Sequence, residues 1–295
     1  MKHTVLVTGA KGQLGSEIKK LAGNYQQLQF IFTDVDELDI TNAFDIKAFL
    51  KSRKIDYIIN CAAYTAVDKA ESEIELAEKI NILAVKNLTD IASELKIKFI
   101  HTSTDYVFDG KNYKPYKEND IPNPQSKYGI TKLKGEEEAL KYENSMIVRT
   151  SWLYTSFGNN FVKTMIKLGN EREELRVVCD QAGTPTYARD LARAILEITN
   201  NTSNNTLPFV PGIYHYSNEG ICSWYDFAKE IMVLTNTSCN IIPIESKDYP
   251  TPARRPSYSV LNKDKIKTTY KIDIPYWKDS LIECLQVMNS QNTSK

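Results

Sequence analysis

The sequence is poor in the residues that build metal centres and disulfide scaffolds. Its 295 residues include three histidines and five cysteines, all widely scattered. No two cysteines form a C-x-x-C pair, and their odd number does not suit a fully paired set of disulfides. We therefore expect no bound metal, and cysteines that remain reduced thiols, as in the cytoplasm.

Net charge and long apolar runs are also missing. Lysine plus arginine and aspartate plus glutamate both number 37, so the chain lacks the basic excess typical of nucleic-acid-binding proteins. The apolar run in "MKHTVLVTGAKGQLG" is too short for a signal peptide, and no stretch approaches the length of a membrane span. The sequence thus predicts a cytoplasmic protein with no nucleic-acid and no membrane partner.

The first half of the chain alternates β-rich segments with helical ones. Hydrophobic strands are expected at residues 3–9, 29–35, 56–63, 98–104 and 145–154. Helices are expected at residues 13–23, 43–54, 77–95 and 126–140. This alternation predicts a parallel sheet covered by helices on both faces. We therefore assign residues 1–165 to a dinucleotide-binding α/β domain with a doubly wound, Rossmann-type sheet.

The second half has a looser pattern. Strands are expected at 175–181 and 212–218, and helices at 190–199 and 223–235, the latter opened by a possible Ser223/Asp226 capping box. We expect residues 166–295 to form mainly a smaller substrate-binding region, with some segments returning to the first domain.

A glycine-rich turn joins the first expected strand to the first expected helix. "VTGAKGQLG" places Gly9, Gly12 and Gly15 there, where a nucleotide pyrophosphate needs close backbone approach and a helix N-terminus. The spacing G-x-x-G-x-x-G differs from the common dinucleotide fingerprint, but its place at the first crossover favours a cofactor site. Asp34, after the second strand, suits the ribose of NAD, whereas Lys11 could attract the 2′-phosphate of NADP. The choice between NADPH and NADH is left open.

The spacing Tyr-x-x-x-Lys occurs three times, and context separates the three copies. Tyr113 and Lys117 flank a proline in a loop, and Tyr225 lies on an amphipathic helix far from the glycine turn, where packing is the simpler role. Tyr128 and Lys132 begin a helix that follows the fourth strand. Active sites of such sheets lie beyond the carboxyl ends of the strands, so Tyr128 is the candidate proton donor.

The end of the fourth strand supplies polar groups at the same edge. "STDY" presents Thr104 and Asp105, and a hydroxyl there can hydrogen-bond a substrate carbonyl. Arg254 and Arg255 in "PARRPSYS" suit a diphosphate, although exposed arginines more often solvate a surface. Which of these two arginines faces inward is not readable from the sequence.

These residues carry a resemblance to a known family. Thr104, Tyr128, Lys132 and "TGAKGQLG" resemble the extended short-chain dehydrogenases/reductases. "NCAAYTAVDKAESE", "HTSTDYVFDG", "DQAGTPT" and "YPTPARRPSYSVLN" are similar, within that family, to the dTDP-4-dehydrorhamnose reductases. The resemblance covers nearly the whole chain and implies NADPH, with NADH possible, as the cofactor and a nucleotide sugar as the substrate.

The resemblance also implies roles for individual residues. Hydride goes to C4 of dTDP-4-dehydro-L-rhamnose, with Tyr128 as proton donor, Thr104 orienting the carbonyl, and Lys132 binding ribose and lowering the Tyr128 pKa. Taken together with the candidates named above from residue type and position, the expected substrate-binding residues are Thr104, Asp105, Tyr128, Trp152, Arg254 and Arg255. The expected cofactor-binding residues, from the same two sources, are Gly9, Lys11, Gly12, Gln13, Leu14, Gly15, Asp34, Asp39, Ile40, Ala62, Ala63, Tyr64, Thr65, Thr102, Tyr128 and Lys132.

Some members of the family form dimers bridged by Mg²⁺ through carboxylates near the C-terminus. Here no aspartate or glutamate follows Glu283, so that metal site is not carried over, and a monomer or homodimer is expected. Two other functions stay open. One is another nucleotide-sugar reductase or epimerase of the same superfamily, and the other is a non-catalytic NADP-binding regulatory subunit.

Overall fold

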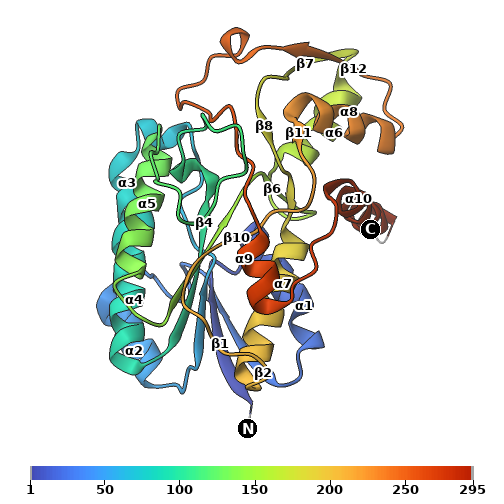
Figure 1. The fold of residues 1–295 in the computed structure, drawn as a ribbon. Coiled ribbons are helices and arrows are strands. Elements are labelled where there is room, and N and C mark those ends of the chain that lie inside the picture. The colour runs from blue at the N-terminus through green and yellow to red at the C-terminus, as the bar shows by residue number, and fades with distance from the viewer. Residues whose placement is uncertain (1, 294–295) are drawn as a thin grey trace.

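A six-stranded parallel sheet forms the centre of the molecule, whose computed structural model describes residues 2–293 (Figure 1). The strand order is β10–β5–β4–β3–β1–β2, and each neighbouring pair is parallel. The strands are β1 (His3–Thr8), β2 (Leu28–Thr33), β3 (Tyr57–Asn60), β4 (Lys98–Thr104), β5 (Ser145–Thr150) and β10 (Gly212–His215). The predicted doubly wound α/β fold is therefore confirmed.

Helices cover both faces of this sheet. On one face α1 (Gln13–Leu21) packs on α7 (Ala188–Ser203). On the other face α4 (Ala84–Leu95) lies between α2 (Ala43–Lys51) and α5 (Lys127–Ala139), as Figure 1 shows. Because the strands are covered on both sides, they carry apolar residues almost continuously.

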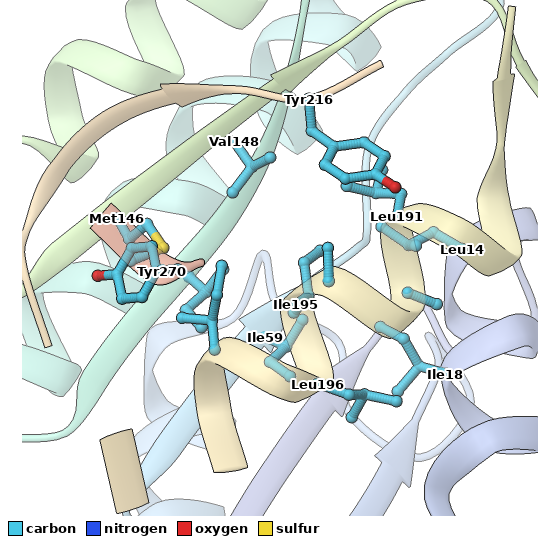
Figure 2. Close-up of a cluster of buried hydrophobic side chains, with 14 of the residues drawn as sticks. Leu14, Ile18, Ile59, Met146, Val148, Leu191, Ile195, Leu196, Tyr216 and Tyr270 are labelled. Carbon is cyan, nitrogen blue, oxygen red and sulfur yellow. The ribbon is translucent and has the colours of Figure 1, made fainter. Parts of the chain in front are cut away.

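The core between α1, α7 and the sheet is closely packed. Figure 2 shows Ile18 of α1 and Ile195 of α7 beside Ile59 of β3, and Val148 of β5 lies in the same cluster. These side chains are almost fully buried, and each contributes on the order of 1.5–3 kcal/mol by leaving water. This core fixes the helix that follows the glycine turn.

The helix expected at 77–95 is interrupted. The structure has α3 (Ile74–Glu78), a π-helical turn at Lys79–Leu83 and then α4. The apolar residues on either side keep spacings of three and four, so the sequence periodicity did not reveal this turn. Asn81 in this turn bonds the backbone of Tyr64, with Nδ2 donating to its carbonyl at 3.1 Å and Oδ1 accepting from its N–H at 2.9 Å.

The second half of the chain builds a smaller layered region above the sheet edge (Figure 1). Its strands pair as β7 (Glu174–Val178) with β12 (Asn240–Ile244), β8 (Ala182–Gly183) with β11 (Cys222–Ser223), and β6 (Leu153–Tyr154) with β9 (Thr186–Tyr187). Its longer helices are α6 (Phe161–Glu171), α8 (Trp224–Leu234) and α10 (Trp277–Thr293). The predicted capping box of Ser223 and Asp226 opens α8 and is confirmed.

Three segments of this half return to the large sheet: β10 extends it next to β5, α7 covers it, and α9 (Asp264–Tyr270) packs on β10 and adds buried residues to the same core. The division at residue 165 stays a prediction. The remaining short elements are the 3₁₀ turns at Ala22–Asn24, Lys69–Glu71, Asp105–Val107 and Ser246–Asp248.

The fifth strand is shorter than expected. It ends at Thr150 rather than at 154, because Trp152 adopts φ +49° and turns the chain into β6. A bulky residue with positive φ is a strained conformation of the kind that gathers at functional sites.

Three features are absent from the part of the chain that the structure describes. None of its helices combines the length and the apolar character needed to cross a bilayer. Residues 2–293 also contain no group of three or more histidine, cysteine, aspartate or glutamate side chains placed to hold a metal ion. All five cysteines are free.

Candidate active site

The glycine turn lies at the carboxyl edge of the sheet and leaves no room for a side chain at Gly9 or at Gly15. Gly9 has φ +65°, and a Cβ on it would lie 2.6 Å from the backbone nitrogen of Ala62. A Cβ on Gly15 would lie 2.3 Å from the carbonyl oxygen of Gly9. Gly12 is the N-cap of α1 and supplies no side-chain cap, so first-turn N–H groups remain available to an anion. This turn fits a pyrophosphate.

A cavity of about 440 Å³ opens beside this turn, between the ends of β1, β2 and β3. The predicted cofactor residues that line it are Gly9, Lys11, Gly12, Asp34, Asp39, Ile40, Ala62 and Ala63. Residues that line it without having been predicted are Thr8, Val35, Leu38, Thr41, Cys61, Leu76, Lys79 and Ile80. Leu76 and Ile80 lie about one helical turn apart, and Leu76 is 45% exposed. Sequence periodicity does not report such exposure, so it gave no signal for Leu76.

The other predicted cofactor residues lie around the cavity rather than in its wall. Leu14 is buried in the core, so only its backbone can serve a ligand. Gln13 accepts a bond from Asn160 at 3.2 Å. Tyr64 packs beside Tyr128, and Thr65 is exposed.

Lys11 and Asp34 are joined by a hydrogen bond, although the sequence gave them opposite preferences, Lys11 for NADP and Asp34 for NAD. The Lys11 N–H donates to Asp34 Oδ2 at 2.9 Å, while Lys11 Nζ pairs with Asp36 at 2.5 Å. The hydrogen bond that Lys11 Nζ donates to Asp36 is the main cause that raises the pKa of Lys11. Exposed ion pairs of this kind are weak because solvent screens them, so Lys11 can exchange Asp36 for another anion. Both a ribose hydroxyl and a 2′-phosphate are compatible with the part of the cavity lined by Lys11 and Asp34.

Tyr128 and Lys132 lie one turn apart on α5, with little exposed surface. The Ser126 hydroxyl caps the helix by accepting from the Gly129 N–H at 3.2 Å. Lys132 Nζ donates to the carbonyl oxygen of Thr102 at 2.8 Å and lies 3.2 Å from His101 Nε2. The helix therefore joins the predicted tyrosine and lysine to the end of β4.

Thr104, the last residue of β4, is held in place by two hydrogen bonds of its hydroxyl group. Its hydroxyl donates to Asp105 Oδ1 at 3.0 Å and accepts from the Tyr106 N–H at 3.2 Å. The Tyr106 ring meets the Tyr128 ring edge to face, with centroids 5.4 Å apart. Burial raises the pKa of Asp105 to about 6, opposed by hydrogen bonds from Ser259 and Thr104.

The pKa of Tyr128 lies above the ordinary tyrosine value, whereas the resemblance implied a lowered pKa. Burial raises the pKa of Tyr128, and a hydrogen bond with Thr104 offsets only part of this effect. Burial sets the direction of this shift, and the predicted lowering of the Tyr128 pKa by Lys132, whose amine donates to Thr102, stays a prediction. Burial also lowers the pKa of Lys132 to about 8, against the carboxylate of Glu136.

The two other Tyr-x-x-x-Lys copies lie elsewhere. Tyr113 is 81% exposed and lies in a loop, and Tyr225 packs against the apolar cluster around α8. Neither lies on α5 or lines the cavity at the glycine turn.

A second cavity, of about 810 Å³, lies between Tyr106, α6, β7, α8 and the segment 248–255. Arg255 lines it and donates to the Tyr106 hydroxyl at 3.0 Å, while its other terminal nitrogen pairs with Asp68 at 2.5 Å. Arg254 is exposed. Arg255 is therefore the inward arginine, and Asp68 and Tyr106 are the partners that sequence reasoning missed.

Trp152 lies near this cavity without lining it. Its ring stacks on Trp224, a lining residue, at 3.6 Å between centroids. A Cβ on residue 183 would lie 2.5 Å from the Trp152 ring. The absence of a side chain at Gly183 therefore leaves the space that the tryptophan ring occupies. Tyr154, two residues further along the chain, is buried in the core.

The fold and the site together define a nicotinamide-dependent oxidoreductase of the short-chain type. Residues 1–290 match the family model described as the RmlD substrate binding domain. A dTDP-4-dehydrorhamnose reductase of Aggregatibacter actinomycetemcomitans is 41% identical over 286 residues, which cover 94% of this chain and 96% of that protein. The chain therefore belongs to the dTDP-4-dehydrorhamnose reductase family.

Solved structures agree with this assignment. A dTDP-4-dehydrorhamnose reductase from Clostridium acetobutylicum is 45% identical, with a TM-score of 0.91 over 97% of this chain and 99% of that one. The enzyme from Bacillus anthracis, solved in complex with NADP, is 38% identical, with a TM-score of 0.91 and the same coverage.

Proposed function

We propose that this protein reduces dTDP-4-dehydro-L-rhamnose to dTDP-L-rhamnose, with Tyr128 as the proton donor. The observation that carries the proposal is the buried Tyr128–Lys132 pair beside Thr104 at the carboxyl edge of the sheet. When bound, NADPH supplies the hydride that goes to C4 of the sugar, and NADH is a possible substitute. The bound NADP of the Bacillus anthracis relative supports this choice.

The chain offers separate groups for each part of the cofactor. Backbone N–H groups of the turn and of the first turn of α1 suit the pyrophosphate, and Asp34 and Lys11 suit the adenosine ribose. Cofactor contacts are proposed for Gly9, Gly12, Gln13, Leu14, Gly15, Asp39, Ile40, Ala62, Ala63, Tyr64, Thr65 and Thr102. Lys132 is proposed to bind the second ribose.

The protonation state of Tyr128 supports its role as an acid. Because burial raises its pKa, the phenol keeps its proton near neutral pH until a stronger base appears beside it. That base is the sugar O4, which gains negative charge as C4 receives hydride. Tyr128 then gives its proton to O4, and Thr104 holds the carbonyl oxygen by a hydrogen bond.

The second cavity suits the nucleotide sugar. Arg255 is placed to pair with a diphosphate in two hydrogen bonds, in exchange for Asp68. Asp105 and Trp152 are proposed substrate contacts, and exposed Arg254 is the weaker candidate of the arginine pair. Five free cysteines support a reducing compartment, in line with a cytoplasmic location.

The test is nicotinamide oxidation with dTDP-4-dehydro-L-rhamnose generated in situ, using NADPH and NADH in parallel. Tyr128→Phe should lower kcat by about 10²–10⁴ while cofactor binding persists, because it removes the acid and little volume. Tyr113→Phe, at the exposed copy of the motif, is the matched control and should keep full activity.

Unchanged turnover in Tyr128→Phe would exclude this tyrosine as proton donor. If the folded wild type binds NADPH yet gives no turnover, the substrate is another nucleotide sugar or the protein is a regulatory subunit.

A further inference from the structure

The carboxylate of Asp68 holds two groups of the segment that forms one wall of the second cavity. Its Oδ1 accepts from the Ala253 N–H at 3.2 Å, and its Oδ2 accepts from Arg255 Nη2 at 2.5 Å. Asp68 belongs to the loop that follows β3, whereas Arg255 lies 187 residues further along the chain. Arg255 lines the cavity and Asp68 does not, so Asp68 acts on the cavity through the arginine.

Asp68 is the only ionic partner of Arg255 within residues 2–293. The other hydrogen bond of the guanidinium is to a neutral group, since Nη1 donates to the Tyr106 hydroxyl at 3.0 Å. The side chains of Arg255 and Asp68 are 28% and 38% exposed, so solvent screens this pair less than a pair on the open surface. An anion that binds Arg255 therefore has one carboxylate to compete with.

The nitrogen that Asp68 occupies is the one that matters most for binding an anion. A guanidinium offers two edges with two parallel N–H groups each, one formed by Nε and Nη2 and the other by Nη1 and Nη2. Because Nη2 belongs to both edges, a phosphate at either edge of Arg255 lies next to the Asp68 carboxylate. Two anions so close together repel each other. Bidentate binding of a diphosphate therefore requires Asp68 to withdraw from Nη2.

Two further arginines line the same cavity, Arg172 at the end of α6 and Arg176 in β7. Neither forms an ion pair with a carboxylate in the part of the chain that the structure describes. A diphosphate held only by these two arginines would not compete with Asp68. The two arrangements therefore give different results when Asp68 is changed.

We propose that Asp68 is an internal competitor for Arg255, a positioning residue that keeps the guanidinium in the cavity wall and yields it to a diphosphate. The inference rests on the proposed function, which assigns the diphosphate of the nucleotide sugar to Arg255. That diphosphate does not react, so its bonds strengthen the binding of substrate and product alike. Asp68 weakens the binding of both and recaptures Arg255 when the product leaves.

Asp68→Asn tests the competition, because it keeps the Oδ1 acceptor for the Ala253 N–H and removes the charge. Isothermal titration measures the Kd for dTDP in the presence of saturating NADP⁺, which occupies the glycine turn. We expect this Kd to fall about fivefold, the effect of losing one weak competing ion pair. Asp90→Asn removes a carboxylate from the exposed pair with Lys86 on α4, and as the matched control it should change the Kd by less than about twofold.

A second background separates competition from simple repulsion. In Arg255→Met the guanidinium is absent, so adding Asp68→Asn should change the Kd for dTDP by less than about twofold. The same gain in both backgrounds would mean that Asp68 acts on a diphosphate held elsewhere, as by Arg172 and Arg176, and would overturn the proposal. Asp68→Ser, which also keeps an oxygen acceptor, gives the same test if the asparagine variant does not fold.

An unchanged or higher Kd in Asp68→Asn would also overturn the proposal, because it would show that the carboxylate supports the cavity wall without competing for Arg255. The titration needs no turnover, so it is separate from the reductase assay. Tighter binding of dTDP by the variant of a protein that does not reduce dTDP-4-dehydro-L-rhamnose would refute the proposed reaction alone. An unchanged Kd in an active reductase would refute this inference alone, and a wild type that does not bind dTDP would refute both.

Discussion

Arg149 and Glu136 form a buried ion pair that joins β5 to α5. Arg149 Nε lies 2.9 Å from Glu136 Oε1, the terminal Nη2 lies 2.6 Å from Oε2, and both side chains are 1% exposed. The Arg149 guanidinium also lies over the Phe108 ring, 5.1 Å from its centroid. The pair anchors the helix that carries Tyr128 and Lys132.

Glu136→Gln should therefore destabilise the protein strongly. It leaves the Arg149 charge buried without a carboxylate, which costs roughly 3–5 kcal/mol in comparable sites. Urea unfolding followed by circular dichroism measures the free energy of unfolding. Glu137→Gln removes the neighbouring exposed carboxylate and should change it by less than about 0.5 kcal/mol. Equal effects of the two substitutions would contradict an anchoring role.

The fold could be predicted from the sequence because its signals are local and repeated. The alternation of apolar strands with helical stripes predicted the sheet, and the place of Tyr128 after the fourth strand separated it from Tyr113 and Tyr225. The π-helical turn at Lys79–Leu83 could not be predicted, since the apolar residues around it keep spacings of three and four, which are typical of a continuous α-helix.

The site was only partly predictable, because its contacts join distant segments. Asp68 lies far from Arg255 in the sequence, and nothing local indicates that the two meet or that Arg254 points away. The pKa of Tyr128 is likewise raised mainly by burial. The Tyr-x-x-x-Lys spacing in the sequence gives no information about how deeply the tyrosine is buried.

Gly15→Ala should weaken NADPH binding by about tenfold or more. A Cβ at this position would lie 2.3 Å from the Gly9 carbonyl oxygen and 2.7 Å from Ala10 Cα, both backbone atoms, so the whole turn must shift. A tenfold loss corresponds to about 1.4 kcal/mol of binding free energy. Isothermal titration of the folded variant with NADPH measures it.

Gly23→Ala is the matched control for this substitution, because a Cβ there meets no atom within 4 Å. It should leave the Kd for NADPH unchanged. A Gly15→Ala protein that binds as tightly as the wild type would show that the turn does not hold the pyrophosphate.

Arg255→Lys should raise KM for the nucleotide sugar by about tenfold, because lysine keeps the charge but loses the planar pair of donors. The expected cause is loss of diphosphate binding, so kcat should change much less than KM. Arg254→Lys, at the exposed neighbour, should change KM by less than about twofold. Steady-state kinetics with both variants checks this, and the reverse ranking would assign the diphosphate to Arg254.

Asp105→Asn should remove a pH-dependent loss of stability. Asp105 is 3% exposed, and burial raises its pKa from the ordinary 3.8 to about 6. A carboxyl group whose pKa is higher in the folded state stabilises the fold while it is protonated. That contribution is complete below about pH 4 and is lost as the pH rises through about 6.

The asparagine variant does not ionise, so its stability relative to the wild type should rise between about pH 4 and 6 and level off above. Two pKa units correspond to an upper limit of about 3 kcal/mol. Urea unfolding of both proteins across this range gives the difference at each pH. Asp273→Asn, at an exposed position, should follow the wild-type curve. A difference between Asp105→Asn and wild type that stays constant with pH would mean that Asp105 is ionised in the folded protein throughout the range.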